Sequence, residues 1–207
     1  MKEKTIKAIF FDLGNVIIKL VMEDLVAAFD GQGKVTNEKI IQYATESDNL
    51  DRYAEGKLTS SQFYSKTKHL FRLDMKYGEF YEAWNSMFAP YPEMEDIIRT
   101  IKKKYPQIKL ILLSNTNESH FNFIRKKYKI LDLMDEMVVS YEVGRQKPHP
   151  DIFKEALRVA GTMSKESFYT DDRADLIEAA RVMGIRAFLF TGAEALREQL
   201  SKFNLEV

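Results

Sequence analysis

Short apolar runs alternate with amphipathic segments along most of this 207-residue chain. The runs end at polar or turn residues and are typical of buried strands; they cover residues 6–11, 108–113, 167–170 and 185–190, with a shorter candidate at 136–140. Unbroken apolar runs, in place of strict alternation, are expected of parallel strands that are covered on both faces. The pattern therefore predicts a doubly wound, Rossmann-like parallel sheet of the α/β class.

The segments between the predicted strands have the periodicity of helices. They cover residues 93–105, 118–128, 150–161 and 173–184. Pro92 and Pro150 stand at the start of two of these segments, and Gly161 and Gly184 end two of them. This is the preferred placement of proline and glycine around helices, so the boundaries support the helix prediction.

Residues 20–88 break the alternation, because they contain helical patterns and no convincing strand. We therefore expect a core formed by residues 1–19 and 89–207 and a small all-helical insert at residues 20–88. Gly56 marks a turn in the insert, and Thr59 to Ser61 supply N-cap candidates for the next helix. Ligands of open α/β sheets bind beyond the carboxyl ends of the strands, and the insert leaves the core directly after the first strand. It is thus expected to cover the binding site as a cap.

The composition is that of an ordinary soluble globular protein, with 45% hydrophobic and 30% charged residues. Lys plus Arg and Asp plus Glu number 31 each, so no long-range field favours nucleic acid or an anionic membrane as a partner. The absence of cysteine excludes disulfides, a thiolate nucleophile and a cysteine zinc site, and it fits a reducing compartment. The chain shows neither a signal-peptide pattern nor an apolar run of membrane-spanning length, so we expect a cytoplasmic protein. The oligomeric state stays open.

Polar residues follow three of the predicted strands at their carboxyl ends. They are Asp12, Ser114 with Asn115, and Asp171 with Asp172. Carboxylates gathered at one edge of a sheet would repel each other strongly unless a cation lay between them. Mg²⁺ prefers hard oxygen ligands and is usually held by one or two carboxylates together with a substrate phosphate. The sequence therefore predicts a magnesium site at this edge.

Lys147 belongs to the loop GRQKPHP, residues 144–150, which follows the candidate strand at 136–140. At the same edge as the acids, its ammonium could neutralise their excess charge and bind a phosphoryl oxygen. Ser114 and Asn115 precede the helix that begins near Glu118, where side chains and backbone N–H groups can seat an anion. These parts predict that an aspartate attacks a phosphoryl group and that water then hydrolyses the aspartyl-phosphate.

Four motifs in this order make the chain resemble the haloacid dehalogenase superfamily: FFDLGNV, ILLSNTN, GRQKPHPDIF and FYTDDRADLIEAARVMGI. Members of that superfamily are mostly magnesium-dependent phosphatases with a Rossmann-like core, and the resemblance implies that the helical insert is a C1-type cap that shapes substrate choice. More narrowly, the motifs are similar to those of the α-D-glucose-1-phosphate phosphatase subgroup and, more loosely, to the phosphatase-like domain of soluble epoxide hydrolases. The substrate implied is a small phosphomonoester such as a sugar phosphate.

The resemblance also implies roles by position. Asp12 is implied as the nucleophile and as a metal ligand. Asp172 is the direct magnesium ligand that the resemblance favours, and Asp171 supports the metal, for instance through water. Three residues are implied to hold or pair with the phosphoryl group: Ser114, Asn115 and Lys147.

Gly14 departs from the superfamily, because most of its phosphatases carry a second aspartate there, which protonates the leaving group and then activates the water. The backbone carbonyl of Gly14, the implied metal ligand, is retained. Loss of a positioned acid should slow poor leaving groups by roughly 10²- to 10⁴-fold. Three interpretations stay open: a phosphatase in which another acid, a water or a substrate hydroxyl compensates, a non-catalytic phospho-ligand binding or interaction protein, and a 2-haloacid dehalogenase, which would not need the acidic pair.

A few further residues are candidates for the site. His149, between two prolines and two positions after Lys147, could approach the phosphate or the leaving group. His120 is expected to be a packed or solvent-facing histidine. Trp84 is expected in the cap's own core, although Tyr43, Tyr53 and Trp84 are the first cap residues to test for ligand stacking.

Overall fold

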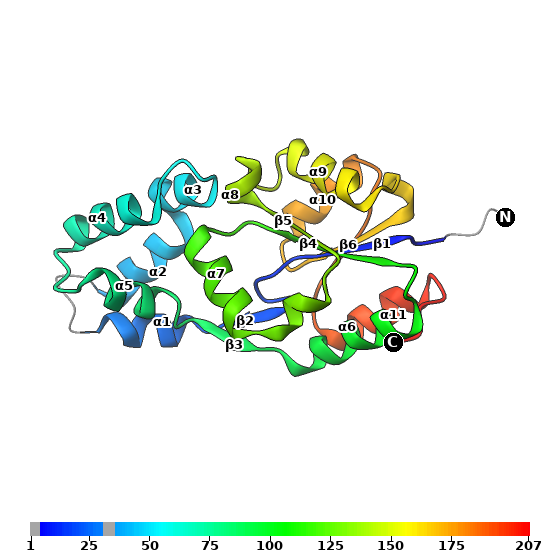
Figure 1. Cartoon of the computed structure of the whole chain (residues 1–207), viewed down its shortest axis with the longest axis horizontal. Helices are drawn as coiled ribbons and strands as arrows, with labels where there is room; N and C mark the ends of the chain where they lie inside the picture. Colours follow the sequence, from blue (N-terminus) through cyan, green and yellow to red (C-terminus); the bar gives the residue numbers. More distant parts are fainter. Residues whose placement is uncertain (1–4, 31–35) are drawn as a thin grey trace.

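A five-stranded parallel sheet lies at the centre of the structure, a computed structural model that describes residues 5–30 and 36–207 (Figure 1). The strand order is β5-β4-β1-β6-β7, and all neighbouring strands run parallel. The strands are β1 (Ala8–Phe11), β4 (Lys109–Ser114), β5 (Glu136–Val139), β6 (Ser167–Asp171) and β7 (Arg186–Leu189). Every residue of β1 is fully buried, as its unbroken apolar run predicts. The predicted α/β fold class is confirmed.

Helices cover both faces of the sheet, and apolar residues of alternate strand positions pack beneath them. One face carries α9 (Pro150–Ala160) and α10 (Ala174–Val182), and the other carries α6 (Pro92–Lys104), α7 (Glu118–Lys127) and α11 (Ala193–Ser201) (Figure 1). Proline occupies the first turn of α6 and α9, and Gly161 ends α9 in the left-handed conformation with φ +67°. The sequence pattern did not predict α11, the single turn of α8 (Ser140–Val143), or the two 3₁₀ segments η1 (Lys129–Leu133) and η2 (Ser164–Glu166).

A group of five helices lies beyond the carboxyl ends of the strands, on the left of Figure 1. They are α1 (Met22–Phe29), α2 (Asn37–Glu46), α3 (Asp48–Ala54), α4 (Ser60–Phe71) and α5 (Tyr77–Trp84). Their shared core is aromatic: the Phe63 ring lies 4.6 Å from that of Tyr53 and 5.2 Å from that of Trp84. Thr59 caps α4 through a capping box with Gln62, as an N-cap candidate should. We call these helices the cap; the exact division at residues 20–88 stays a prediction, and residues 1–4 and 31–35 of the predicted core and cap lie outside the described residues.

A short antiparallel strand pair connects the cap to the sheet, and the sequence analysis missed it. The strands β2 (Ile18–Leu20) and β3 (Phe88–Pro90) pair Leu20 with Phe88, and the Val21 N–H donates to the Met87 carbonyl oxygen at 2.7 Å. Each strand has only three residues and they lie far apart in sequence, so neither carries a recognisable pattern by itself. The pair fixes the two chain crossings between the sheet and the cap.

The cap also contacts the core through closely approaching backbone. Gly56 has φ +68°, and a Cβ at this position would lie 2.3 Å from the Tyr141 carbonyl oxygen, so both the turn and the contact require glycine. The buried Ser140 hydroxyl lies 2.6 Å from the Ala54 carbonyl oxygen and 3.0 Å from the Thr116 N–H nitrogen that donates to it. These contacts hold α3 of the cap against the core.

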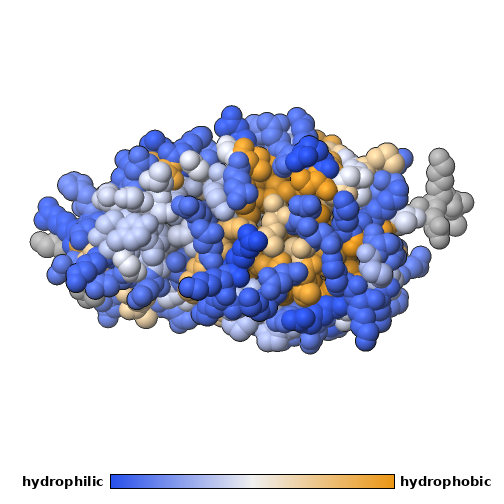
Figure 2. Space-filling model, in the orientation of Figure 1, coloured by the Kyte–Doolittle hydropathy of each residue, from blue (hydrophilic) through white to orange (hydrophobic). Residues whose placement is uncertain are grey.

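Hydrophilic residues dominate the surface of the cap in the view of Figure 2, whereas apolar residues gather over the middle of the core. Across the described ranges, no helix combines the length and the apolar character that crossing a membrane requires.

Candidate active site

The carboxyl ends of three neighbouring strands place polar side chains around one cavity. The chain passes from β1 to β4 and β5 on one side of the sheet and returns to β6 and β7 on the other, so the strand order reverses beside β1. A cavity of about 410 Å³ lies there, between the sheet and the cap. All seven residues predicted for the site line it: Asp12, Gly14, Ser114, Asn115, Lys147, Asp171 and Asp172. The structure therefore brings these seven residues together, whereas the role of each residue stays a prediction.

Lys147 lies at the centre of this group, with a side chain that is fully buried. Its ammonium nitrogen lies 2.6 Å from Asp12 Oδ1, 2.7 Å from Asp171 Oδ2 and 2.9 Å from the carbonyl oxygen of Leu113. An ammonium has three protons, so these three bonds use all of its donors. Both carboxylates raise the pKa of Lys147 against the opposing effect of burial, which keeps the side chain charged. Lys147 therefore joins two acids from different strands into one ionic network.

The surroundings of Asp12 strongly change its pKa. Burial raises the pKa of Asp12 to about 7; Lys147 opposes this shift, and the nearby charge of Asp171 adds to it. A carboxyl group in this state gains from any additional positive charge at the site. Without a metal ion, the single positive charge of Lys147 therefore does not balance the negative charges of the carboxylates around it.

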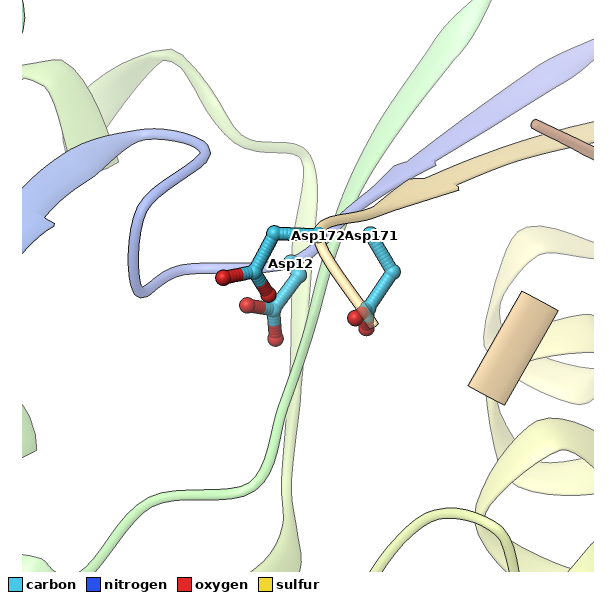
Figure 3. A group of neighbouring side chains, drawn as sticks. All are labelled: Asp12, Asp171 and Asp172. Atoms are coloured by element: carbon cyan, nitrogen blue, oxygen red, sulfur yellow. The ribbon is translucent and has the colours of Figure 1, made fainter. Parts of the chain in front are cut away.

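Three carboxylates present a donor set that suits a hard divalent cation. One oxygen each of Asp12, Asp171 and Asp172 lies within 4.8 Å of the others (Figure 3). Oxygen ligands of this kind, with room for water and a phosphate, are what Mg²⁺ requires. The residues therefore fit the predicted cation, which would offset the repulsion between the acids.

Asn15 is a site residue that the sequence analysis did not single out. Its amide Nδ2 donates to Asp172 Oδ2 at 2.9 Å, and its Oδ1 accepts from the Leu20 N–H at 3.2 Å. Asn15 adopts the left-handed conformation with φ +56°, which asparagine tolerates better than most residues. An asparagine directly after a glycine was therefore the sequence signal that could have pointed to Asn15. Asn15 connects the Asp172 carboxylate to the first strand of the β2-β3 pair.

Leu20 occupies the space beside Gly14. A Cβ built on Gly14 would lie 3.2 Å from Leu20 Cδ1, which is tighter than an ordinary van der Waals contact, and 3.6 Å from Leu20 Cγ. Both residues line the cavity. An apolar side chain therefore lies beside the position where an acid is missing.

Ser114 and Asn115 follow each other at the end of β4 and line the cavity together. The Asn115 side chain holds the lysine loop: its Oδ1 accepts from the Lys147 N–H at 2.7 Å, and its Nδ2 donates to the Lys147 carbonyl at 2.9 Å. An asparagine amide has two donor protons, and the bond to the carbonyl uses one. Asn115 thus positions Lys147 and keeps a donor, which the sequence analysis did not foresee.

The cap supplies a mixed wall opposite the acids. Its cavity-lining residues include Ala44, Thr45, Leu50, Asp51 and Ala54. Gln146, next to Lys147 in the core, donates from Nε2 to Asp51 Oδ1 at 3.2 Å and so connects this wall to the lysine loop. The cap residues to test first for ligand stacking do not line this cavity: Tyr43, Tyr53 and Trp84 are buried in the aromatic core of the cap, where Trp84 was expected.

The two candidate histidines take different places. His120 lines the cavity and stacks on Trp84 with ring centroids 5.4 Å apart, and burial lowers its pKa to about 3. Its Nδ1 pairs with the Asn117 amide at 3.1 Å, so it is a neutral packed histidine, as expected. His149 lines a neighbouring hollow and its Nδ1 accepts from the Asp151 N–H at 3.3 Å.

Known proteins are similar to this chain in sequence and architecture. The profile of a family described as haloacid dehalogenase-like hydrolase matches residues 9–190. The chain is 25% identical over 203 residues to a D-ribitol-5-phosphate phosphatase of Bacteroides thetaiotaomicron, covering 95% of this chain and 97% of the relative. It is 27% identical over 218 residues to a glyceraldehyde 3-phosphate phosphatase of Methanothermobacter thermautotrophicus, covering 98% and 94%. A crystal structure of a HAD family enzyme of B. thetaiotaomicron, in complex with magnesium and inorganic phosphate, is similar with a TM-score of 0.78 at 26% identity, over 89% of this chain and 93% of that one.

Proposed function

The chain belongs to the haloacid dehalogenase-like hydrolase family and is a hydrolase of phosphomonoesters, and we propose that it dephosphorylates a small sugar phosphate through attack by Asp12. The observation that carries this proposal is the position of Lys147 between Asp12 and Asp171, with Asp172 in the same cluster. The two curated relatives are named for phosphatases of ribitol 5-phosphate and glyceraldehyde 3-phosphate, which supports the substrate class. A cavity of about 410 Å³ also suits a small ligand.

Magnesium is the cofactor, and the similar enzyme of B. thetaiotaomicron was crystallised with it. Asp12, Asp172 and the carbonyl of Gly14 would hold the ion, with Asp171 as a supporting acid. When bound, Mg²⁺ supplies positive charge that offsets the carboxylates and the phosphoryl oxygens. The remaining steps are assigned to the chain's own residues.

The attack is assigned to Asp12 Oδ2, because Oδ1 accepts from Lys147. This oxygen forms a bond to phosphorus while the bond from phosphorus to the leaving oxygen breaks, which leaves the phosphoryl group on Asp12 as an aspartyl-phosphate. The Ser114 hydroxyl and the remaining amide proton of Asn115 donate to the phosphoryl oxygens. Water then attacks phosphorus, frees the Asp12 carboxylate and yields inorganic phosphate.

The leaving oxygen needs a proton that residue 14 does not provide. The nearest side chain that a Cβ on Gly14 would meet is Leu20, which has no proton to give. The proton then comes from another acid, from water or from a hydroxyl of the substrate. A sugar phosphate carries such hydroxyls next to the ester, which is a second reason to favour this class.

Phosphate release from a panel of phosphomonoesters tests the proposal. We expect the wild-type protein to release phosphate from small sugar phosphates with Mg²⁺ and to lose this activity with EDTA or in Asp12→Asn. Activity that ignores the metal, or that survives Asp12→Asn, would contradict the mechanism. Halide release from 2-haloacids would instead support a dehalogenase, and binding of phosphate without turnover of any ester would support a non-catalytic protein.

A further inference from the structure

Asp171 differs from the other two acids in the number of protein groups that bind it. Its Oδ2 accepts from Lys147 Nζ at 2.7 Å and also from the Tyr169 hydroxyl, and its Oδ1 accepts from the Arg173 N–H at 2.9 Å. The residue is only 1% exposed. Both carboxylate oxygens are therefore engaged with donors of the chain itself.

Asp172 is situated differently, although it is the next residue. It is half-buried, lines the cavity and accepts from Asn15 through Oδ2. Figure 3 shows the side chains of Asp171 and Asp172 leaving adjacent positions of the chain, with both carboxyl groups near that of Asp12. The two adjacent acids thus have different partners: Asp171 accepts from the lysine, and Asp172 accepts from Asn15.

Tyr169 is the residue that completes the surroundings of Asp171. Positions 169 and 171 are two apart on β6, so their side chains lie on the same face of the strand. The tyrosine is fully buried, and its ring packs edge-to-face on Phe153 with centroids 5.7 Å apart. Burial also raises the pKa of Tyr169 well above its usual value, so the hydroxyl stays a donor.

The same ring contacts the lysine. Lys147 Nζ lies 5.5 Å from the centroid of the Tyr169 ring, within the range of a cation–π contact. Tyr169 therefore touches both members of the Lys147–Asp171 pair, through its ring and its hydroxyl. Two independent contacts on one ion pair fix its geometry more tightly than either contact alone.

We propose that Tyr169 is a positioning residue that holds Asp171 against Lys147, so that Asp171 orients the lysine beside Asp12 and does not bind the metal directly. The inference rests on the proposed function in so far as Asp12 is the nucleophile. It keeps the metal ligands proposed above, Asp12, Asp172 and the carbonyl of Gly14, and assigns Asp171 to the lysine. Without the tyrosine hydroxyl, the Asp171 carboxylate would lose one of its donors and would hold the lysine less firmly.

Tyr169→Phe tests this role, because it keeps the ring and its packing and removes only the hydroxyl. We expect kcat for the best sugar phosphate to fall by roughly 10- to 100-fold, the effect of losing one hydrogen bond to a charged group, with KM little changed. The affinity for Mg²⁺ alone, measured by isothermal titration calorimetry, should stay within about threefold of wild type. Tyr105→Phe is the matched control, since its hydroxyl accepts from the Glu206 N–H at 2.8 Å, far along the chain from the site.

Two further variants separate positioning from metal binding. Asp171→Asn should lose kcat yet keep its Mg²⁺ affinity, whereas Asp172→Asn should weaken Mg²⁺ binding by more than tenfold, and thermal unfolding checks that each variant folds. Wild-type kcat in Tyr169→Phe, or Mg²⁺ affinity in Asp171→Asn as weak as in Asp172→Asn, would overturn the proposal. The calorimetry requires no turnover, so it decides the role of Asp171 even if the wild-type protein hydrolyses none of the esters. Absence of all hydrolysis would contradict only the proposed function.

Discussion

Replacement of Lys147 by methionine would remove the charge that joins the two buried acids. The ammonium bonds Asp12 and Asp171 at 2.6 and 2.7 Å, and its side chain has no exposed surface. Methionine fills a similar volume, so the change tests charge and hydrogen bonding more than packing. The two carboxylates would remain close together without a cation between them.

The expected cost follows from this geometry. Removing one partner of a buried ion pair typically destabilises a protein by about 3–5 kcal/mol, because the other charge is left buried and unpaired. In metal-free Lys147→Met at neutral pH we therefore expect the free energy of unfolding to fall by about this amount. The loss should shrink as the pH is lowered, because protonation of Asp12 removes the uncompensated charge.

Urea unfolding in EDTA at pH 5 and pH 8 measures this effect. Lys154→Met is the control, since its Nζ lies 3.1 Å from Asp151 Oδ1 on the surface, where both side chains are more than half exposed. Exposed pairs contribute about 0–1 kcal/mol, so the control should unfold like wild type. A Lys147→Met variant within about 1 kcal/mol of wild type at both pH values would refute the reasoning.

Three other predictions concern the acid cluster, position 14 and the contact of the cap with the core. The pKa of Asp12 is raised from 3.8 to about 7, so the folded state binds more protons than the unfolded state between these pH values. The free energy of unfolding of the metal-free protein should therefore fall by up to about 4 kcal/mol as the pH rises through this window. A free energy from urea unfolding that is constant or rises with pH would contradict this. Gly14→Asp requires Leu20 Cδ1, 3.2 Å from the new Cβ, to move by a few tenths of an ångström. Gly14→Asp combined with Leu20→Ala should therefore reduce the preference for aryl over alkyl esters in steady-state assays more than Gly14→Asp alone. Ser140→Ala should lower the free energy of unfolding by about 1–3 kcal/mol, because it leaves the buried Thr116 N–H and the Ala54 carbonyl without this partner, and an unchanged urea midpoint would argue against that role.

Much of the core could be predicted because its signals are local. The strands β1, β4 and β6 contain short apolar runs, and the polar residues that end these runs lie at the same edge once the strands are parallel. The amino-acid pattern alone therefore predicts that Asp12, Ser114 and Asp171 lie together. Lys147 could be predicted at the same edge of the sheet because its loop also follows a strand.

The remaining features depend on contacts between distant residues, which one sequence does not display. The β2-β3 pair needs three-residue strands from either end of the cap to meet, and Leu20 fills the space at Gly14 only because of that pairing. Asn115 holds the backbone of Lys147, which lies 32 residues further along the chain. The sequence shows that Tyr169 and Asp171 are two positions apart on one strand, but it does not show that Asp171 accepts a hydrogen bond from Tyr169.

Detection of phosphate on Asp12 tests the central claim most directly. The wild-type protein would be mixed with a sugar phosphate and Mg²⁺, quenched in acid within the first turnover, digested and analysed by peptide mass spectrometry, with Asp12→Asn as the control. We predict a phosphorylated peptide that contains Asp12, which forms and decays at rates compatible with turnover and is absent from the variant. Turnover of the ester with no phosphate on this peptide, or with phosphate on another residue, would contradict the account.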